Sequence, residues 1–381
     1  MRSATSFRLL FVPAVALLAA ACDDSRLPQE PAAAKRVVPT REGVPVRQDG
    51  AALLGSATHW ADGYLEGHSE TTPIYSPGPT YSFNRSGRGT ITITKLAGTT
   101  GRYVATFSGL SAYLGSRSTV HVTGYLNGGT YCKPAAAYLV SDKVEVRCFR
   151  PGTGLPVDAT FSLLVTRNYP DLAFAYAHQA TSTGYSPSAQ GSWNPAGTSR
   201  VTRTGVGQYR VTFNNLGAQL PPNVFGHVQV NAVGTSNAYC NPYNWGTSGS
   251  PNLFVDVRCY ESPTGAPVDR RFTVLFVLPA DHLAYAWADK PAAASYSPLA
   301  YYSSNPTGNA VTIIRRGVGI YDVYWDSVDG EIIDEGNVQV TAYGSNAQCK
   351  GARNSLSGAT VQCFAPNGTP VDSRYTVLFG S

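Results

Sequence analysis

Cysteine is the residue type in this chain with the clearest chemical potential, and six of the seven cysteines fall into three pairs of similar spacing. Paired thiols form either disulfides or metal sites, and a metal site would usually add histidine ligands. No histidine recurs beside the pairs. We therefore predict no metal or cofactor, and one disulfide in each of three sequence repeats: Cys132 with Cys148, Cys240 with Cys259, and Cys349 with Cys363.

Acid–base and nucleophilic chemistry have little support in the sequence. None of the six histidines recurs at one position of all three repeats, and the common hydrolase and phosphate-loop motifs are absent. The carboxylates present in every repeat are Asp158, Asp269 and Asp372, each in a Pro-Val-Asp turn. We predict that they accept backbone N–H bonds, because a glycosidase would need a second repeated acid. We expect no catalytic residue. A secreted hydrolase with one specialised repeat is the alternative.

Aromatic side chains are plentiful, with 23 tyrosines and 5 tryptophans. Exposed aromatics among amide and hydroxyl side chains are typical of sugar-binding sites, since a ring stacks on pyranose C–H groups while amides bond the hydroxyls. The alternative is that these aromatics pack at a domain edge or against the neighbouring repeat. The candidate ligand-binding residues are in segments interpreted as loops: Trp193, Tyr243, Asn244, Trp245, Tyr301 and Tyr302.

The N-terminus predicts export. Residues 1–21 combine two arginines, a short apolar run and a small-residue cleavage site, which is typical of a signal peptide. The stretch ending at Cys22 resembles a bacterial lipobox, in which the cysteine is lipidated. Residues 22–55 are rich in Pro and small residues and predict the lipidated Cys followed by a disordered tether. We expect an extracytoplasmic lipoprotein of a bacterial envelope, periplasmic or at the cell surface, that contacts the membrane only through its N-terminal lipid.

Internal repetition gives the domain organisation. Tyr-Ser-Pro, Gly-x-Tyr, Val-x-Val, a Cys pair and Pro-Val-Asp recur in that order about every 110 residues. That period is a whole domain rather than a solenoid unit. The predicted β-domain repeats are residues 56–170, 171–280 and 281–381.

The fold class follows from the local pattern within each repeat. Segments such as 207–213 alternate apolar and polar residues with the period of a half-buried strand. Short strands separated by Gly-, Pro- and Asn-rich turns predict an all-β protein of three tandem antiparallel β-sandwiches, Ig-like or jelly-roll-like, each with one disulfide. Almost no linker separates the repeats, so we expect a row of closely packed domains forming a semi-rigid rod.

The chain resembles a group of uncharacterised secreted bacterial proteins. The resemblance covers about residues 56–381 and rests on the Gly-x-Tyr-x-Val-x-Phe strand, the Val-Gln-Val-Thr-Ala-Tyr-Gly strand at 338–344, and the Arg-Cys-Phe and Pro-x-Asp elements. It implies the fold and the compartment, with no assigned activity.

These observations favour a non-enzymatic surface lipoprotein that acts as a spacer or an adhesive module, with a carbohydrate-binding protein as an alternative. The formal net charge of +5 includes two arginines of the signal peptide, and no basic run is present. Nucleic acid is therefore not an expected partner. The expected partners are a glycan or an envelope or surface protein.

Overall fold

The computed structural model describes residues 61–67, 72–87, 89–125, 128–247, 249–328, 336–354 and 358–380. They belong to one compact unit that extends from Ala52 to Ser381. The predicted signal peptide, Cys22 and the tether lie outside the described residues. The predicted repeat boundaries fall between strands. The first lies between β9 (Phe161–Arg167) and β10 (Leu172–Ala177), and the second lies between β17 (Phe272–Val277) and β18 (Leu283–Ala288).

Repeat 1 contains β1 (Gly63–Gly67), β2 (Ile74–Tyr75), η1 (Pro79–Tyr81), β3 (Ser82–Asn84), β4 (Ile91–Lys95), β5 (Arg102–Phe107), α1 (Leu110–Leu114), β6 (Ser118–Gly124), β7 (Tyr131–Pro134), β8 (Lys143–Phe149) and β9. Repeat 2 contains β10, β11 (Gly184–Tyr185), β12 (Ser199–Gly205), β13 (Gln208–Phe213), η2 (Gly217–Gln219), β14 (His227–Ala232), β15 (Tyr239–Gly246), β16 (Leu253–Tyr260) and β17. Repeat 3 contains β18, β19 (Ser295–Tyr296), η3 (Ala300–Tyr302), β20 (Ser303–Ser304), β21 (Val311–Gly317), β22 (Ile320–Trp325), β23 (Asn337–Ala342), β24 (Gln348–Asn354), β25 (Gly358–Phe364) and β26 (Tyr375–Gly380).

Each repeat is a sandwich of two antiparallel sheets. The outer sheets have the strand orders β2-β4-β5-β8-β7, β11-β12-β13-β16-β15 and β19-β21-β22-β25-β24. The central sheets have the orders β3-β1-β9-β6, β10-β17-β14 and β20-β18-β26-β23. The predicted all-β fold of three tandem sandwiches is thus confirmed.

The outer sheets follow the alternation seen in the sequence. In β13, Tyr209, Val211 and Phe213 are buried, and the residues between them are exposed or half-buried. Period-2 alternation places the buried set on the face that covers the core of the sandwich. A strand of this kind has one face in solvent.

The central sheets differ because both of their faces are buried. In β10 every residue is buried, and small and large side chains alternate. Ala173 and Ala175 face the core of their own sandwich, whereas Phe174 belongs to a second apolar cluster shared with the other repeats. The small alanines let the two sheets of the sandwich approach closely, and the large aromatics are used between repeats.

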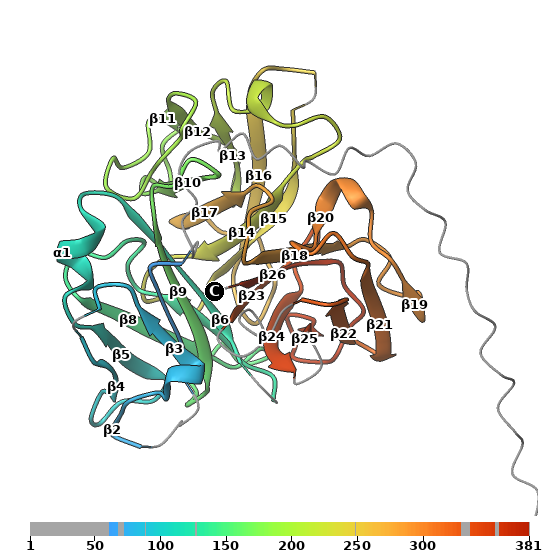
Figure 1. Ribbon diagram of the computed structural model, residues 1–381. Coiled ribbons are helices and arrows are strands. Elements are labelled where there is room, and N and C mark those ends of the chain that lie inside the picture. Colours follow the sequence, from blue (N-terminus) through green and yellow to red (C-terminus); the bar gives the residue numbers. More distant parts are fainter. Residues whose placement is uncertain are drawn as a thin grey trace, which may run out of the picture. The chain divides into compact units, whose positions relative to one another are not determined.

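The three central sheets meet one another, so the repeats do not form a row. Strands β6, β14 and β23 contact each other in all three combinations, and Figure 1 shows their labels close together. Asn337 of repeat 3 donates to Ser162 Oγ of repeat 1 at 2.6 Å, and Thr341 of repeat 3 donates to Gln229 Oε1 of repeat 2 at 2.6 Å. Close packing of the repeats was predicted correctly. The prediction of a semi-rigid rod was wrong, because the first and last repeats of a rod would not contact each other.

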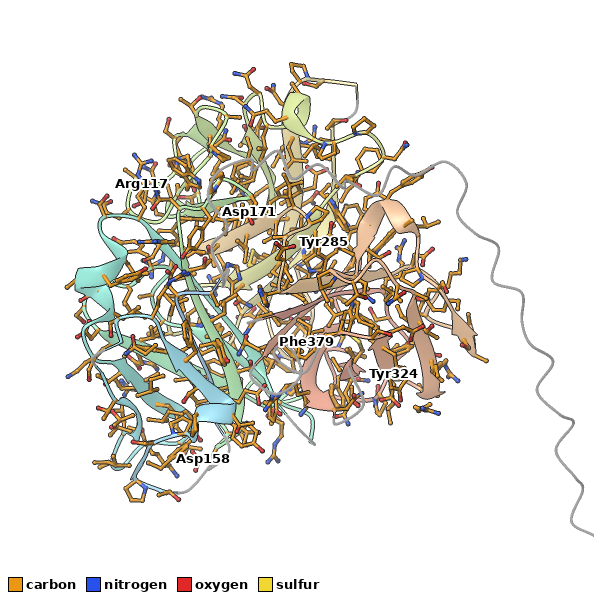
Figure 2. All side chains as sticks on the ribbon, in the orientation of Figure 1. Arg117, Asp158, Asp171, Tyr285, Tyr324 and Phe379 are labelled. Atoms are coloured by element: carbon orange, nitrogen blue, oxygen red, sulfur yellow. A yellow bond between two sulfur atoms is a disulfide. The ribbon has the colours of Figure 1, made fainter. Side chains whose placement is uncertain are left out.

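A shared apolar cluster stabilises this arrangement. Equivalent positions of the three repeats supply Tyr64, Phe174 and Tyr285 from the first strands and Leu164, Leu275 and Leu378 from the last. The Tyr285 ring, labelled in Figure 2, lies 5.1 Å from the ring of His227 in repeat 2. Burying one such leucine contributes about 1.5–3 kcal/mol. The contact between repeats is therefore a second hydrophobic core.

The three disulfides connect the predicted pairs. Cys132 and Cys148 occupy directly paired positions of β7 and β8, and the other two bonds, Cys240–Cys259 and Cys349–Cys363, cross the equivalent strand pairs. Each bond closes a short hairpin at one edge of an outer sheet. Disulfides are compatible with an extracytoplasmic location. No helix among the described residues is long and apolar enough to span a membrane.

Candidate functional site

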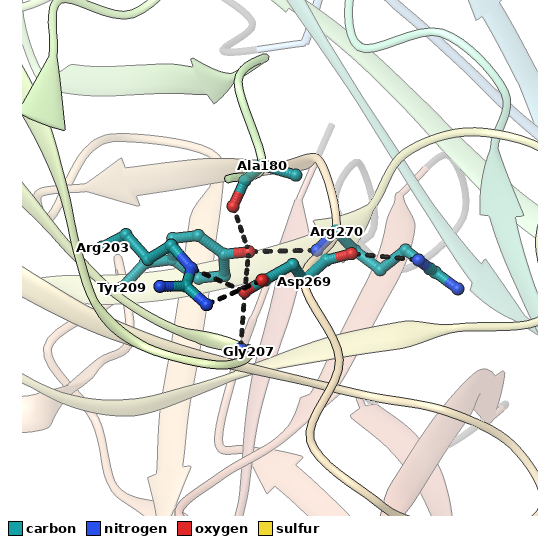
Figure 3. A network of polar contacts seen from close by, with 6 residues as sticks. All are labelled: Ala180, Arg203, Gly207, Tyr209, Asp269 and Arg270. Carbon is teal, nitrogen blue, oxygen red and sulfur yellow. Dashed lines mark hydrogen bonds and ion pairs between the residues drawn. The ribbon is translucent and has the colours of Figure 1, made fainter. Parts of the chain in front are cut away.

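The repeated aspartates form a structural network. Asp269 accepts two hydrogen bonds from the guanidinium of Arg203, at 2.9 and 2.8 Å, one from the Gly207 N–H at 2.8 Å and one from the Tyr209 hydroxyl at 3.1 Å (Figure 3). The Arg203 bonds are the largest cause of the lowered pKa of Asp269. The carboxylate ties the β12–β13 turn to the start of the last strand, because Tyr209 in turn accepts from the Arg270 N–H at 3.0 Å.

The same network occurs in the other two repeats. Asp158 accepts from the Gly101 N–H at 2.7 Å, and Asp372 accepts from the Gly319 N–H at 2.8 Å. Lys95 pairs with Asp158, while Asp372 receives two bonds from Arg315. The predicted role of these aspartates as acceptors of backbone N–H bonds is confirmed. Carboxylates held by this many donors are poorly suited to proton transfer near neutral pH.

The buried histidines belong to the contact between repeats. His121 and His227 are about 1 % and 0 % exposed, and burial lowers the pKa of each to about 3. Their Nε2 atoms lie 3.2 Å from Thr119 Oγ1 and 2.8 Å from Gln229 Nε2, respectively. Among the described residues, neither ring has a carboxylate partner to make it a general base. Within the described part of the chain, no three His, Cys, Asp or Glu residues are placed to hold a metal ion.

The tryptophans that the sequence places in loops are packed against protein. Trp245 lies in β15 and is 4 % exposed, so its interpretation as an exposed loop residue is wrong. Its Nε1 donates to Phe225 O at 3.0 Å. Its ring has edge-to-face contacts with Trp287, Tyr302 and Tyr343 of repeat 3. The alternative interpretation, packing against the neighbouring repeat, describes this side chain.

The other candidate aromatics are divided between junctions and surface. Trp193 is half-buried beside the shared cluster, where its Nε1 donates to Tyr169 O at 2.8 Å. Tyr302 joins the Trp245 cluster, and the neighbouring Tyr301 is 47 % exposed. The structure therefore brings Trp245, Tyr301 and Tyr302 to the junction of repeats 2 and 3 and keeps Trp193 apart from them.

Tyr243 and Asn244 are exposed at a register shift in β15. Tyr243 is 38 % exposed, and the guanidinium carbon of Arg258 lies 3.4 Å from the centre of its ring. Such stacking fixes the ring at the surface. Tyr243 and Asn244 are thus candidate residues that remain at the surface, and Arg258 covers one face of the Tyr243 ring.

Next to Tyr243 the surface is hollowed. A cavity of about 230 Å³ lies in repeat 3 and is lined by Pro291, Tyr343, Ser345, Asn346, Ala347, Ala365, Val371, Asp372, Ser373 and Arg374. We call it the repeat 3 hollow. Gly344 donates to Pro242 O at 3.0 Å, so the hollow adjoins the exposed part of β15. Electrostatic coupling between Tyr343 and Tyr243 supports the same placement.

The charged groups of the hollow differ in their availability. Asp372 is engaged with Arg315, Gly319 and Tyr321. Arg374 is exposed, and its guanidinium carbon lies 5.4 Å from the centre of the Tyr343 ring. Burial raises the pKa of Tyr343 to about 12, whereas the charge of Arg374 opposes that rise. The hollow thus offers a guanidinium, amide and hydroxyl groups and part of an aromatic ring.

Sequence reasoning missed the hollow because its residues come from separate segments. The lining residues of 343–347 and 371–374 become neighbours through the β23–β26 pairing, where Ala342 lies opposite Tyr375. The available signal was that repeats 2 and 3 carry Arg271 and Arg374 where repeat 1 carries Thr160. No protein-family model, curated protein or solved structure matches the chain. The resemblance to uncharacterised secreted bacterial proteins therefore stays a prediction.

Proposed function

We propose that this protein is a non-enzymatic lipoprotein of a bacterial envelope that acts as an adhesive or binding module. The observation that carries the proposal is the repeat 3 hollow, a surface cavity of about 230 Å³ with several unlike polar groups. The repeated aspartates are committed to structural bonds, and the histidines at the centre are buried with no acidic partner in the described part of the chain. Binding needs only a shaped surface with placed polar groups.

The arrangement of the repeats favours binding over a spacer role. A spacer gains reach when its domains follow one another in a row. Here repeat 3 contacts repeat 1 through Asn337 and Ser162, so the third domain adds little length. A compact support with a core in each repeat and a cluster shared between repeats instead holds surface groups in fixed positions, which lowers the entropy lost on binding.

Carbohydrate is the ligand class whose chemistry fits best. Sugar hydroxyls need donors and acceptors at short spacing, and a pyranose face stacks on an aromatic ring. The hollow supplies Ser345, Asn346 and Arg374 beside Tyr343, and the exposed Tyr243 adjoins it. An acidic sugar would also pair with the guanidinium of Arg374.

The experiment is saturable binding of the full chain to a glycan panel and to isolated cell envelopes. Arg374→Gln removes the exposed cation of the hollow, and Arg271→Gln is the control because Arg271 occupies the equivalent position of repeat 2. Loss of a charged hydrogen bond weakens binding by about tenfold or more. Binding that Arg374→Gln reduces and Arg271→Gln preserves supports the proposal. Equal binding by both variants, or release of shortened sugars detected by mass spectrometry, contradicts it.

A further inference from the structure

A small cavity lies where the three repeats meet. Its volume is about 40 Å³, and all three repeats contribute to its lining. The lining residues come from equivalent positions of the three repeats. They are the disulfide cysteines Cys132, Cys240 and Cys349, the residues directly before them, Tyr131, Tyr239 and Gln348, and the polar residues Thr123, Asn231 and Thr341. About 10–15 Å³ is enough to admit one water molecule. The central cavity therefore has room for a small occupant with polar partners.

Lys133 lines this cavity and is 2 % exposed. Its ammonium donates one hydrogen bond, to Ala238 O of repeat 2 at 2.8 Å, and lies 5.8 Å from the centre of the Phe149 ring. An ammonium has three N–H donors, so this carbonyl satisfies only one of them. No ion pair joins Lys133 to a carboxylate in the part of the chain that the structure describes. A buried charge without a counter-charge is strongly unfavourable.

The groups around Lys133 add positive charge. Burial lowers its pKa to about 7, and the nearby charges of Arg270, Arg147 and Arg271 act in the same direction. Arg147 is paired with Glu145 at 2.9 Å. Arg270 donates to the backbone oxygen of Asp269, which carries no charge. The charges that act on Lys133 are therefore mainly positive.

Gln348 provides a second polar group at the same cavity. Its side chain lies beside the Tyr239 phenol and is about 5 % exposed. A weak contact of the Gln348 amide with the Tyr239 hydroxyl opposes the rise in the pKa of Tyr239, but neither amide atom reaches full hydrogen-bond geometry with a group in the described residues. An occupant that accepts hydrogen bonds would satisfy both the amide N–H of Gln348 and the remaining donors of Lys133.

We propose that the central cavity binds a small monovalent anion of the size of chloride, with Lys133 as its counter-charge. With a pKa of about 7, Lys133 is protonated in about half of the molecules at pH 7. Water alone would leave the charge of that form uncompensated, whereas a bound anion would favour the protonated form. A larger anion carrying a carbon chain does not fit the volume. Because the lining comes from all three repeats, the anion would connect them and would favour the assembled arrangement over separated repeats.

The experiment compares thermal unfolding of the full chain at pH 7 in sodium chloride and in sodium gluconate of equal concentration. We expect the midpoint to rise with chloride and to level off, with bromide acting alike. Lys133→Asn should lose this response, and it should fold because Asn241 stands at the equivalent position and donates to Ala347 O at 2.8 Å. Lys143→Asn is the control, since Lys143 is exposed and the substitution is the same. A midpoint that is the same in both salts, or a chloride response that persists in Lys133→Asn, overturns the proposal.

Diffraction from crystals of the full chain grown in bromide provides a test that does not depend on any variant. An anomalous peak next to Lys133 supports the proposal. Ordered density there without anomalous signal would mean water alone, which contradicts it.

Discussion

Replacing Asp269 by Asn should destabilise repeat 2 by about 2–3 kcal/mol. With its oxygen at the Oδ1 position, the carboxamide can still accept from the Gly207 N–H, the Tyr209 hydroxyl and Arg203 Nε. The bond from Arg203 Nη2 to Oδ2 is lost, an amide N–H₂ then faces that donor, and the remaining Arg203 bond no longer joins opposite charges. A hydrogen bond to a charged group contributes about 1.5–3 kcal/mol. The Asp269 side chain is 19 % exposed, so solvent screening keeps the total below the sum of two such bonds.

The assay is urea unfolding with the disulfides intact, and the chain supplies a matched control. Asp256 also receives two guanidinium bonds, from Arg210 at 2.7 and 2.8 Å, but that arginine is 47 % exposed. Asp256→Asn should therefore cost less than about 1 kcal/mol. The Asp269 pKa is lowered, so its contribution is present above about pH 4, the unfolded value, and is lost as pH falls through the folded value. Equal costs at pH 7 for the two variants would refute the reasoning.

Two further predictions concern the contact between repeats. Unfolded histidine binds a proton below about pH 6.5, whereas buried His121 stays neutral, so each such residue lowers the free energy of unfolding by about 2 kcal/mol between pH 7 and pH 5. His121→Gln should therefore make the free energy of unfolding in urea less sensitive to acid. An unchanged dependence of that free energy on pH would contradict this. Leu378→Ala should cost about 2–5 kcal/mol because the side chain is 0 % exposed in the shared cluster; a cost below about 0.5 kcal/mol in urea unfolding, as for a surface residue, would show that the repeats are not packed in this way.

The fold of each repeat could be predicted from the sequence because the patterns that indicate it lie within short segments of the chain. Alternation in segments such as 207–213 depends only on which face of a strand is buried. The cysteine pairs follow from one pair per repeat, and their strands are neighbours in the chain. Turn residues around Gly207 and Gly319 require positive φ, which glycine adopts readily.

The arrangement of the repeats was not accessible in the same way. The alternation of Ala173, Phe174 and Ala175 reads as a half-buried strand, and nothing in it says whether the aromatic face meets solvent, a neighbour or a more distant repeat. Contacts such as Asn337 with Ser162 join positions 175 residues apart. The same limitation explains Trp245: its neighbours in sequence are polar, but the partners that bury it come from repeat 3.

Because the three repeats are joined in one chain, equivalent positions at the contact between repeats can carry different residues. In an assembly of three separate identical subunits, every substitution at the centre appears three times. Here one position of the centre carries Lys133, Asn241 and Lys350, and another carries His121, Gln229 and Gln339. Covalent linkage thus permits quasi-symmetry with individual specialisation, so that one or two repeats can acquire a charge, or one a hollow, while all three continue to supply the scaffold.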